Sequence, residues 1–219
     1  MFEPPSAASA WLQVEQLACE RDERRLFSDL SFSVSAGDML QIEGPNGVGK
    51  TSLMRVLAGL LPAVEGRLLW QGEPLEDQWS EFYQATLFLG HLAGIKPELT
   101  TLENLSWYAA QEGETDEALL EQALAQVGLQ GYEDQPAHQL SAGQKRRVAL
   151  ARLLITHKPF WLLDEPFTAL DKAAVAALEQ RMVAHTRAGG AVVLISHHAL
   201  EGLPGLKKLV LQASVEEGR

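Results

Sequence analysis

The stretch that most constrains the fold is GPNGVGKT at residues 44–51, which lies between an apolar β-like run and a segment with helical periodicity. It fits the pattern G-x-x-x-x-G-K-[ST] of a phosphate-binding loop. Glycines at positions 44, 47 and 49 let the backbone curl with its N–H groups facing inward, and the N-terminus of the following helix adds partial positive charge. The succession of strand, loop and helix therefore predicts a site for the phosphates of a nucleotide.

Individual residues of this loop are predicted to take separate roles. Lys50 would reach the β- and γ-phosphates, and the hydroxyl of Thr51 would coordinate Mg²⁺. The residues predicted to bind ATP are Gly44, Pro45, Asn46, Gly47, Val48, Gly49, Lys50, Thr51 and Ser52.

A second motif, FWLLDE at residues 160–165, is an apolar strand that ends in two carboxylates. Hydrolysis of Mg²⁺·ATP needs one carboxylate to hold the water shell of the metal and a second group to activate the attacking water. Asp164 is predicted to hold the water shell of the metal, and Glu165 is predicted to activate the attacking water as a catalytic base. A strand capped by acidic turn residues would look similar, but the phosphate loop favours the catalytic interpretation.

The order of segments predicts an α/β fold of the P-loop nucleotide-binding class. Strands that return after helices imply a mainly parallel sheet with helices on both faces, and turns at Gly37–Asp38 and Gly72–Glu73 indicate an antiparallel flank. Helical periodicity covers residues 50–61, 102–111, 116–127, 142–156 and 173–186. We expect a nucleotide-binding core at 11–91 and 156–219, an inserted helical subdomain at 92–155, and a flexible tail at 1–10.

Composition argues against several classes of function. The net charge of −11 argues against a nucleic-acid binder, whose affinity rests on Lys and Arg. No stretch approaches the roughly 18 apolar residues of a membrane span, and the single Cys19 allows no internal disulfide. Between Lys96 and Lys145 the charged residues are all acidic, which fits either a solvated helical face or a surface for a basic partner.

The stretch QLSAGQKRR at residues 139–147 places a serine and a glycine where a helix should begin. A hydroxyl, backbone N–H groups and the helix dipole together suit an anion, which need not belong to the same chain. With the two motifs above, LSAGQ resembles the LSGGQ signature of the ATP-binding-cassette (ABC) ATPases and differs at Ala142. The resemblance extends from about Trp11 to Gln212, with four main motifs in the family's order.

The resemblance implies an ATPase that binds two Mg²⁺·ATP between two copies of itself. In that family, the signature of one copy closes over ATP held by the phosphate loop of the other. Asp171 in TALD would communicate across the dimer, and His197 in ISHH would be the switch histidine on the γ-phosphate, catalytic together with Lys50 and Glu165. The signature residues are Leu140, Ser141, Ala142, Gly143 and Gln144.

Two positions depart from the pattern of the family. The family usually has an aromatic residue that stacks on adenine, whereas CERDERRL at residues 19–26 offers none, so we expect Arg21 or Arg24 to cover the base. His91 stands where the family has its Q-loop glutamine. Because imidazole is a poor ligand for Mg²⁺, we expect His91 to take part in catalysis by orienting water or by bonding the nucleotide indirectly.

The resemblance also implies a membrane partner, since no span is expected in this chain. Among transporters, the motifs resemble the ATP-binding subunit of the bacterial cytochrome c maturation system. That implies a peripheral ATPase on the cytoplasmic face of the inner membrane, bound to an integral membrane permease and coupled to haem delivery or export. An ABC exporter subunit for another cargo is the alternative. A non-transport ABC ATPase would need a long coiled coil or basic arms, and a small-molecule P-loop kinase would have no use for LSAGQ or TALD.

Overall fold

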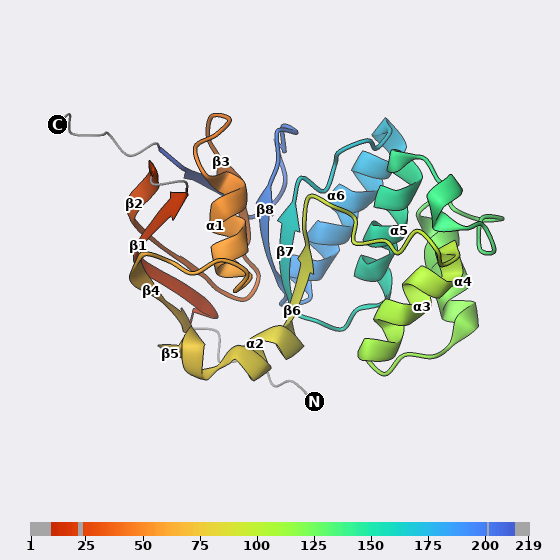
Figure 1. The fold of residues 1–219 in the computed structure, drawn as a ribbon, viewed down its shortest axis with the longest axis horizontal. Coiled ribbons are helices and arrows are strands. Elements are labelled where there is room, and N and C mark those ends of the chain that lie inside the picture. The colour runs from red at the N-terminus through yellow and green to blue at the C-terminus, as the bar shows by residue number, and fades with distance from the viewer. Residues whose placement is uncertain (1–9, 22–23, 201, 213–219) are drawn as a thin grey trace. The chain divides into compact units, whose positions relative to one another are not determined.

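The computed structural model describes residues 10–21, 24–200 and 202–212 (Figure 1). Residues 1–9, which make up nearly all of the tail predicted at 1–10, lie outside the described residues. The chain divides into two compact units. Unit 1 comprises residues 1–88, 159–164 and 181–219, and unit 2 comprises residues 89–158 and 165–180.

One sheet of unit 1 is antiparallel, with its strands in the order β2-β1-β4-β5. These strands are β1 (Leu12–Arg21), β2 (Arg24–Val34), β4 (Glu65–Trp70) and β5 (Glu73–Pro74). Gln71 and Gly72 join β4 to β5 with φ of 54° and 90°, as a two-residue hairpin requires. The predicted antiparallel flank is therefore confirmed. The turn at Gly37 was expected to join two strands of this sheet. It instead leads from β2 to the strand at Met39–Glu43, which belongs to the other sheet.

The second sheet of unit 1 has the order β6-β7-β8-β3-β9. Its strands are β3 (Met39–Glu43), β6 (Thr86–Leu89), β7 (Phe160–Asp164), β8 (Ala191–Ile195) and β9 (Leu206–Val210). The pairs β7–β8, β8–β3 and β3–β9 are parallel. Every residue of β7 and β8 is buried, which explains why both read as unbroken apolar runs. The carboxyl ends of β3, β7 and β8 therefore meet at one edge, where ligands of α/β sheets bind.

Two α-helices and a short 3₁₀ turn of unit 1 lie between these strands in the chain. They are α1 (Lys50–Leu57), the turn at Leu75–Asp77, and α2 (Trp79–Ala85), which the sequence analysis missed. Helix α1 ends four residues before the predicted Leu61, because Gly59 takes a φ of 70° directly after the cap at Ala58. An aromatic cluster of Trp70, Phe82 and Phe160 lies in the core of this unit.

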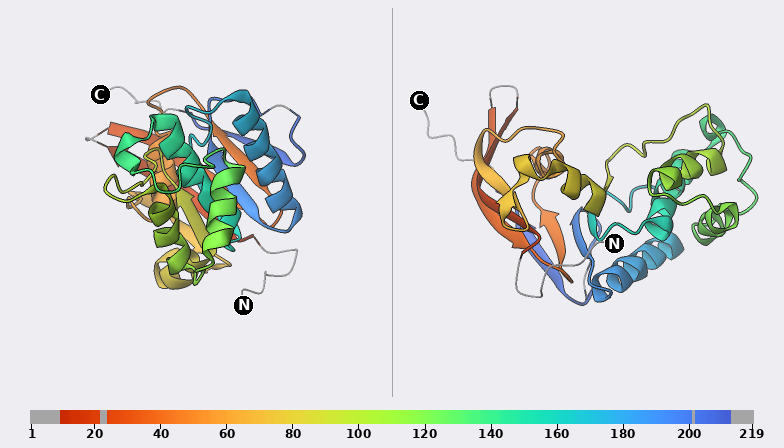
Figure 2. Two further views of the ribbon diagram at one scale, coloured as in Figure 1. Left: turned by 90° about the vertical axis from the view of Figure 1, so that its right-hand side faces the viewer. Right: turned by 90° about the horizontal axis from the view of Figure 1, so that it is seen from below.

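Unit 2 contains three α-helices packed on one another, drawn in green and teal in Figure 2. They are α3 (Thr101–Gln111), α4 (Glu117–Gln126) and α5 (Ala142–Ile155), with a 3₁₀ turn at Ala137–Gln139. Leu105, Leu120, Leu124 and Val148 share their apolar core. A capping box at Thr100 fixes the start of α3. The last helix, α6 (Lys172–Arg187), has residues 172–180 in unit 2 and the rest in unit 1.

Candidate nucleotide-binding site

The predicted phosphate loop lies between β3 and α1. Gly44, Gly47 and Gly49 have φ of 148°, 80° and 106°, values that glycine adopts readily and other residues rarely do. A Cβ atom added to Gly44 would lie 2.6 Å from the carbonyl oxygen of Leu211, so the loop has no room there for a side chain. Gly49 is the N-cap of α1 and has no side chain to cap it, which leaves the first N–H groups of the helix for an anion.

Lys50, the first residue of α1, lies folded over this loop. Its side chain is buried, and its Nζ donates hydrogen bonds to the carbonyl oxygens of Gly44 at 2.7 Å and Pro45 at 3.0 Å. The ammonium group is therefore held against the loop backbone. Thr51 follows it with an exposed side chain.

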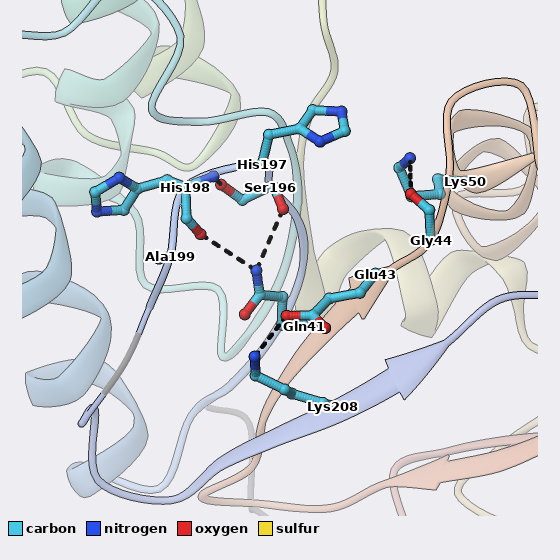
Figure 3. Close-up of a pocket in the computed structure, with 9 residues that line it drawn as sticks. All are labelled: Gln41, Glu43, Gly44, Lys50, Ser196, His197, His198, Ala199 and Lys208. Atoms are coloured by element: carbon cyan, nitrogen blue, oxygen red, sulfur yellow. Dashed lines mark hydrogen bonds and ion pairs between the residues drawn. The ribbon is translucent and has the colours of Figure 1, made fainter.

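A cavity of about 270 Å³ opens beside the phosphate loop (Figure 3). Its lining residues are Gln41, Glu43, Gly44, Lys50, Ser196, His197, His198, Ala199 and Lys208. Lys50 and His197 thus line one cavity, although 147 positions separate them in the chain. Figure 3 shows the rings of His197 and His198 pointing in opposite directions. The cavity therefore brings together two of the residues that the sequence assigned to the γ-phosphate.

The two predicted carboxylates follow each other at the end of β7. Asp164 is its last residue and is 2% exposed. Glu165 begins the next loop with a φ of 51°, in the left-handed region that residues other than glycine seldom occupy. Backbone strain of this kind concentrates at functional sites, so it is consistent with the catalytic interpretation of Glu165.

The donors of unit 1 suit Mg²⁺. Thr51 offers a hydroxyl and Asp164 a carboxylate, both of them hard oxygen ligands. Among the described residues, no group of three or more His, Cys, Asp or Glu side chains could hold a metal ion by itself. Mg²⁺ is typically bound by one or two protein oxygens together with the phosphates of the substrate, the number that Thr51 and Asp164 offer.

The signature residues form the start of α5 in unit 2. Ser141 is the N-cap, and its Oγ accepts a hydrogen bond from the N–H of Gln144 at 3.2 Å. In return, Gln144 Oε1 accepts one from the N–H of Ser141 at 2.9 Å, which completes a capping box. A Cβ atom on Gly143 would lie 2.8 Å from the carbonyl oxygen of Ala169, whereas Ala142 is exposed. The chain therefore tolerates a methyl group at 142 and needs glycine at 143.

Comparison with known proteins decides the family. The sequence model of the ABC transporter family matches residues 27–168. The chain belongs to the ABC transporter family. A relative from Pseudomonas fluorescens (strain Pf0-1), the cytochrome c biogenesis ATP-binding export protein CcmA, is 54% identical over 88% of this chain and 92% of its own length. The protein of that name from Escherichia coli (strain K12) is 53% identical over 86% of this chain and 90% of its own length.

Solved structures agree with this membership. An ATP-binding subunit of an ABC transporter, 26% identical, covers 85% of this chain and 79% of its own with a TM-score of 0.76. An ABC transporter ATP-binding protein from Pyrococcus furiosus, 22% identical, shares the fold with a TM-score of 0.77 over 90% of this chain and 96% of its own. The predicted fold, the predicted family and the predicted ATPase activity are therefore confirmed. Within the described residues, no helix of this ABC ATPase is long and apolar enough to cross a membrane.

Asp171 of the ABC ATPase has partners in its own chain. It forms an ion pair with Arg147 of α5, and its Oδ1 accepts a hydrogen bond from the N–H of Ala174 at 2.9 Å. The N–H of Ala174 and the charge of Arg147 lower the pKa of the Asp171 carboxyl below its ordinary value. Asp171 is thus held as an anion beside the signature helix. Its role in communication between two copies stays a prediction.

His91 and the two arginines proposed for adenine all lie at the surface. His91 is exposed in the loop between β6 and α3. Arg21 and Arg24 pair across the ends of β1 and β2, and both are exposed. Leu26 lies close to the phosphate loop, since a Cβ atom on Gly49 would be 3.0 Å from the Cβ of Leu26. The hairpin of β1 and β2 therefore approaches the phosphate loop at Leu26, two residues after Arg24.

Replacement of Arg21 or Arg24 by alanine tests this assignment. We expect one of the two variants to bind ATP about three- to tenfold more weakly, because a guanidinium stacked on a ring contributes roughly 1 kcal/mol at an exposed site. Titration with a fluorescent ATP analogue measures the affinity. Arg67→Ala is the matched control, since Arg67 pairs with Glu15 elsewhere on the same sheet. Unchanged affinity in both Arg21→Ala and Arg24→Ala would remove arginine from the base site.

Sequence analysis missed a buried amide beside His197. Gln41, in the middle of β3, is 2% exposed, and its Nε2 donates hydrogen bonds to the carbonyl oxygens of Ser196 at 3.2 Å and His198 at 3.4 Å. These two carbonyls flank His197, so Gln41 fastens its loop to the strand that leads into the phosphate loop (Figure 3). The sequence did contain a sign of this contact, since Gln41 is a polar residue in the middle of the apolar strand MLQIE.

Proposed function

We propose that this ABC ATPase powers haem delivery or export during the biogenesis of c-type cytochromes, on the cytoplasmic face of the bacterial inner membrane. The observation that carries the proposal is the identity of 53–54% to relatives named cytochrome c biogenesis ATP-binding export protein, over nearly the whole length of both chains. An ABC exporter for another cargo remains the second candidate. The motifs of the nucleotide site support it equally well, because they bind and hydrolyse ATP and do not recognise the transported cargo.

Each part of the site then has a role in hydrolysis. The phosphate loop and Lys50 hold the β- and γ-phosphates, and Thr51 and Asp164 would hold Mg²⁺, which would supply positive charge to stabilise the transferred phosphoryl group. Glu165 accepts a proton from the attacking water, and His197 bonds the γ-phosphate. The cavity shared by Lys50 and His197 supports this division of roles.

A second copy of the chain completes each site. The N-terminus of α5, with Ser141 and Gly143, presents a hydroxyl, backbone N–H groups and the positive end of a helix dipole to ATP held by the other copy. The capping box at Ser141 supports this role, because it fixes the position of that hydroxyl before any partner binds. ATP thereby joins the two copies, and hydrolysis releases them.

The membrane partner is a separate permease that binds unit 2. The loop of residues 90–99 exposes Leu92 to 84%, and α3 exposes Trp107 to 45%. Lys96 Nζ lies 4.1 Å from the centre of the Trp107 ring. Exposed apolar and aromatic side chains are typical of a surface that meets another protein.

Covalently bound haem in c-type cytochromes is the direct readout of this function. We expect cells without the gene to lack haem-stained c-type cytochrome, and the wild-type gene but not Glu165→Gln to restore it, because delivery requires hydrolysis. Immunoblots for the ATPase confirm equal expression. If covalent haem persists without the gene and no second copy of it is present, the cytochrome function fails, and the exporter for another cargo replaces it.

A further inference from the structure

Arg146, in the second turn of α5, is a charged residue inside unit 2. It is only 5% exposed. Its Nη1 donates a hydrogen bond to the carbonyl oxygen of Gly90 at 2.8 Å. Its Nη2 donates to the carbonyl oxygen of Glu165 at 2.8 Å, and its Nε lies 3.5 Å from that of Pro166. One guanidinium group thus binds the backbones of two loops, at Gly90 and at Glu165, that are 75 residues apart in the sequence.

Stability does not explain this choice of residue. A buried guanidinium loses its hydration, and well-packed apolar residues usually stabilise a protein at least as well. An arginine offers a rigid, planar fork whose separate nitrogens donate in fixed directions to carbonyls on different segments, whereas the donors of a lysine all lie on one nitrogen. The geometry therefore suggests that Arg146 fixes the relative position of two loops.

One of these loops carries the proposed catalytic base. Glu165 has a φ of 51°, a conformation that needs support from its surroundings. The bond from Arg146 to the Glu165 carbonyl provides such support, and the backbone conformation decides where the carboxylate points. The other loop carries His91, which directly follows Gly90, and the exposed Leu92.

We propose that Arg146 is a positioning residue that holds Glu165 in its catalytic orientation and links it to the loop of residues 90–99. This inference rests on the proposed function of Glu165 as the base and of that loop as part of the permease contact. A permease that displaces Gly90 would also move Arg146, which is bonded to the Glu165 carbonyl. Binding of the permease would therefore change the position of the catalytic carboxylate.

The test is steady-state ATP hydrolysis by the complex of the ATPase with its membrane partner. We expect Arg146→Met to lower kcat by about ten- to a hundredfold, since small displacements of a catalytic group cost this much. The KM for ATP should stay within about twofold, because the phosphate loop that holds ATP is unchanged. Arg146→Lys, which keeps the charge but loses the fork, should also lower kcat. A wild-type kcat in Arg146→Met, or in Arg146→Lys if the first variant does not fold, would overturn the proposal.

Arg152 supplies a matched control on the same helix. It is half-buried, and its guanidinium lies 3.7 Å from the centre of the Tyr108 ring. Arg152→Met removes a packed arginine from α5 that bonds neither Gly90 nor Glu165, although its neighbour Tyr108 donates a hydrogen bond to the carbonyl oxygen of Gly94. We expect it to lower the temperature of unfolding while kcat stays within about twofold of wild type. An equal loss of kcat in both variants would show that Arg146 acts only through stability.

Two further measurements separate this inference from the proposed function. In a Glu165→Gln background, Arg146→Met should lower kcat no further, because the group that it positions is already gone. If Glu165→Gln itself keeps full activity, the proposed base is wrong whatever Arg146 does. The ratio of ATP turnover with the membrane partner to turnover without it measures how strongly the loop of residues 90–99 affects Glu165. It should fall towards one in Arg146→Lys, and an unchanged ratio would remove the loop of residues 90–99 from the proposal.

Discussion

Glu165→Gln is expected to bind Mg²⁺·ATP, to hydrolyse it at least about a hundredfold more slowly than wild type, and to accumulate as a dimer. The amide cannot accept the proton of the attacking water, so the γ-phosphate stays in place. The residues that hold ATP, Lys50 and the rest of the phosphate loop, are unchanged. Phosphate release measures turnover, and size-exclusion chromatography in saturating Mg²⁺·ATP measures the dimer.

The control for this variant is Glu121→Gln, which makes the same chemical change at an exposed position on α4. It should hydrolyse ATP like the wild type and elute like it. A wild-type rate in Glu165→Gln would exclude Glu165 as the base. A monomeric elution profile in saturating Mg²⁺·ATP, both alone and with the membrane partner, would contradict the ATP-bound dimer.

Much of the fold and of the nucleotide site could be predicted because the chemistry is local in the sequence. GPNGVGKT supplies loop, lysine and helix start within eight residues, and each glycine expected to allow the curl has a positive φ. The strands β7 and β8 were recognisable since burial on both faces demands uninterrupted apolar residues. Where a single segment decides the structure, its pattern is enough to predict it.

The parts that could not be predicted depend on contacts between distant segments. Gln41 bonds carbonyls 155 and 157 residues further along the chain, and Arg146 reaches back 56 residues to Gly90. Gln41 belongs to no motif, and Arg146 lies two positions after the signature LSAGQ, where the sequence analysis gave it no role. Helix α2 was missed because seven residues are too few for helical periodicity to stand out. Its place is fixed instead by Phe82, which packs against Trp70 and Phe160.

His185, a histidine outside the motifs, lies in a setting that affects how the stability of the protein depends on pH. His185 stacks on Trp161 with ring centres 3.6 Å apart and planes at 10°. Its Nε2 lies 2.9 Å from the carbonyl oxygen of Pro159, to which it donates a hydrogen bond. Burial of the ring, with a smaller contribution from the charge of Arg181, lowers the pKa of His185 from 6.5 to about 4, although the bond to Pro159 opposes this change. The folded protein therefore keeps this ring neutral.

This difference should make unit 1 lose stability as the pH falls. In the unfolded chain His185 takes up a proton below about pH 6.5, whereas in the folded chain it does so only near pH 4, so acid favours the unfolded state. The stabilising effect is complete above pH 6.5 and declines between pH 6.5 and 4. From a shift of this size we expect a loss of about 2 kcal/mol in the free energy of unfolding between pH 8 and pH 5.

Urea unfolding at pH 8 and pH 5, followed by tryptophan fluorescence, measures this loss in the wild type and in two variants. His185→Gln cannot titrate but can still donate to Pro159, so it should be less stable than wild type at pH 8 and should lose about 2 kcal/mol less on acidification. His157→Gln, which replaces an exposed histidine, should behave like the wild type. Protonation of carboxylates also destabilises the fold in acid. The decisive quantity is therefore the loss of unfolding free energy between pH 8 and pH 5, compared between wild type and His185→Gln. An equal loss in both would show that the ring of His185 does not carry the pH dependence.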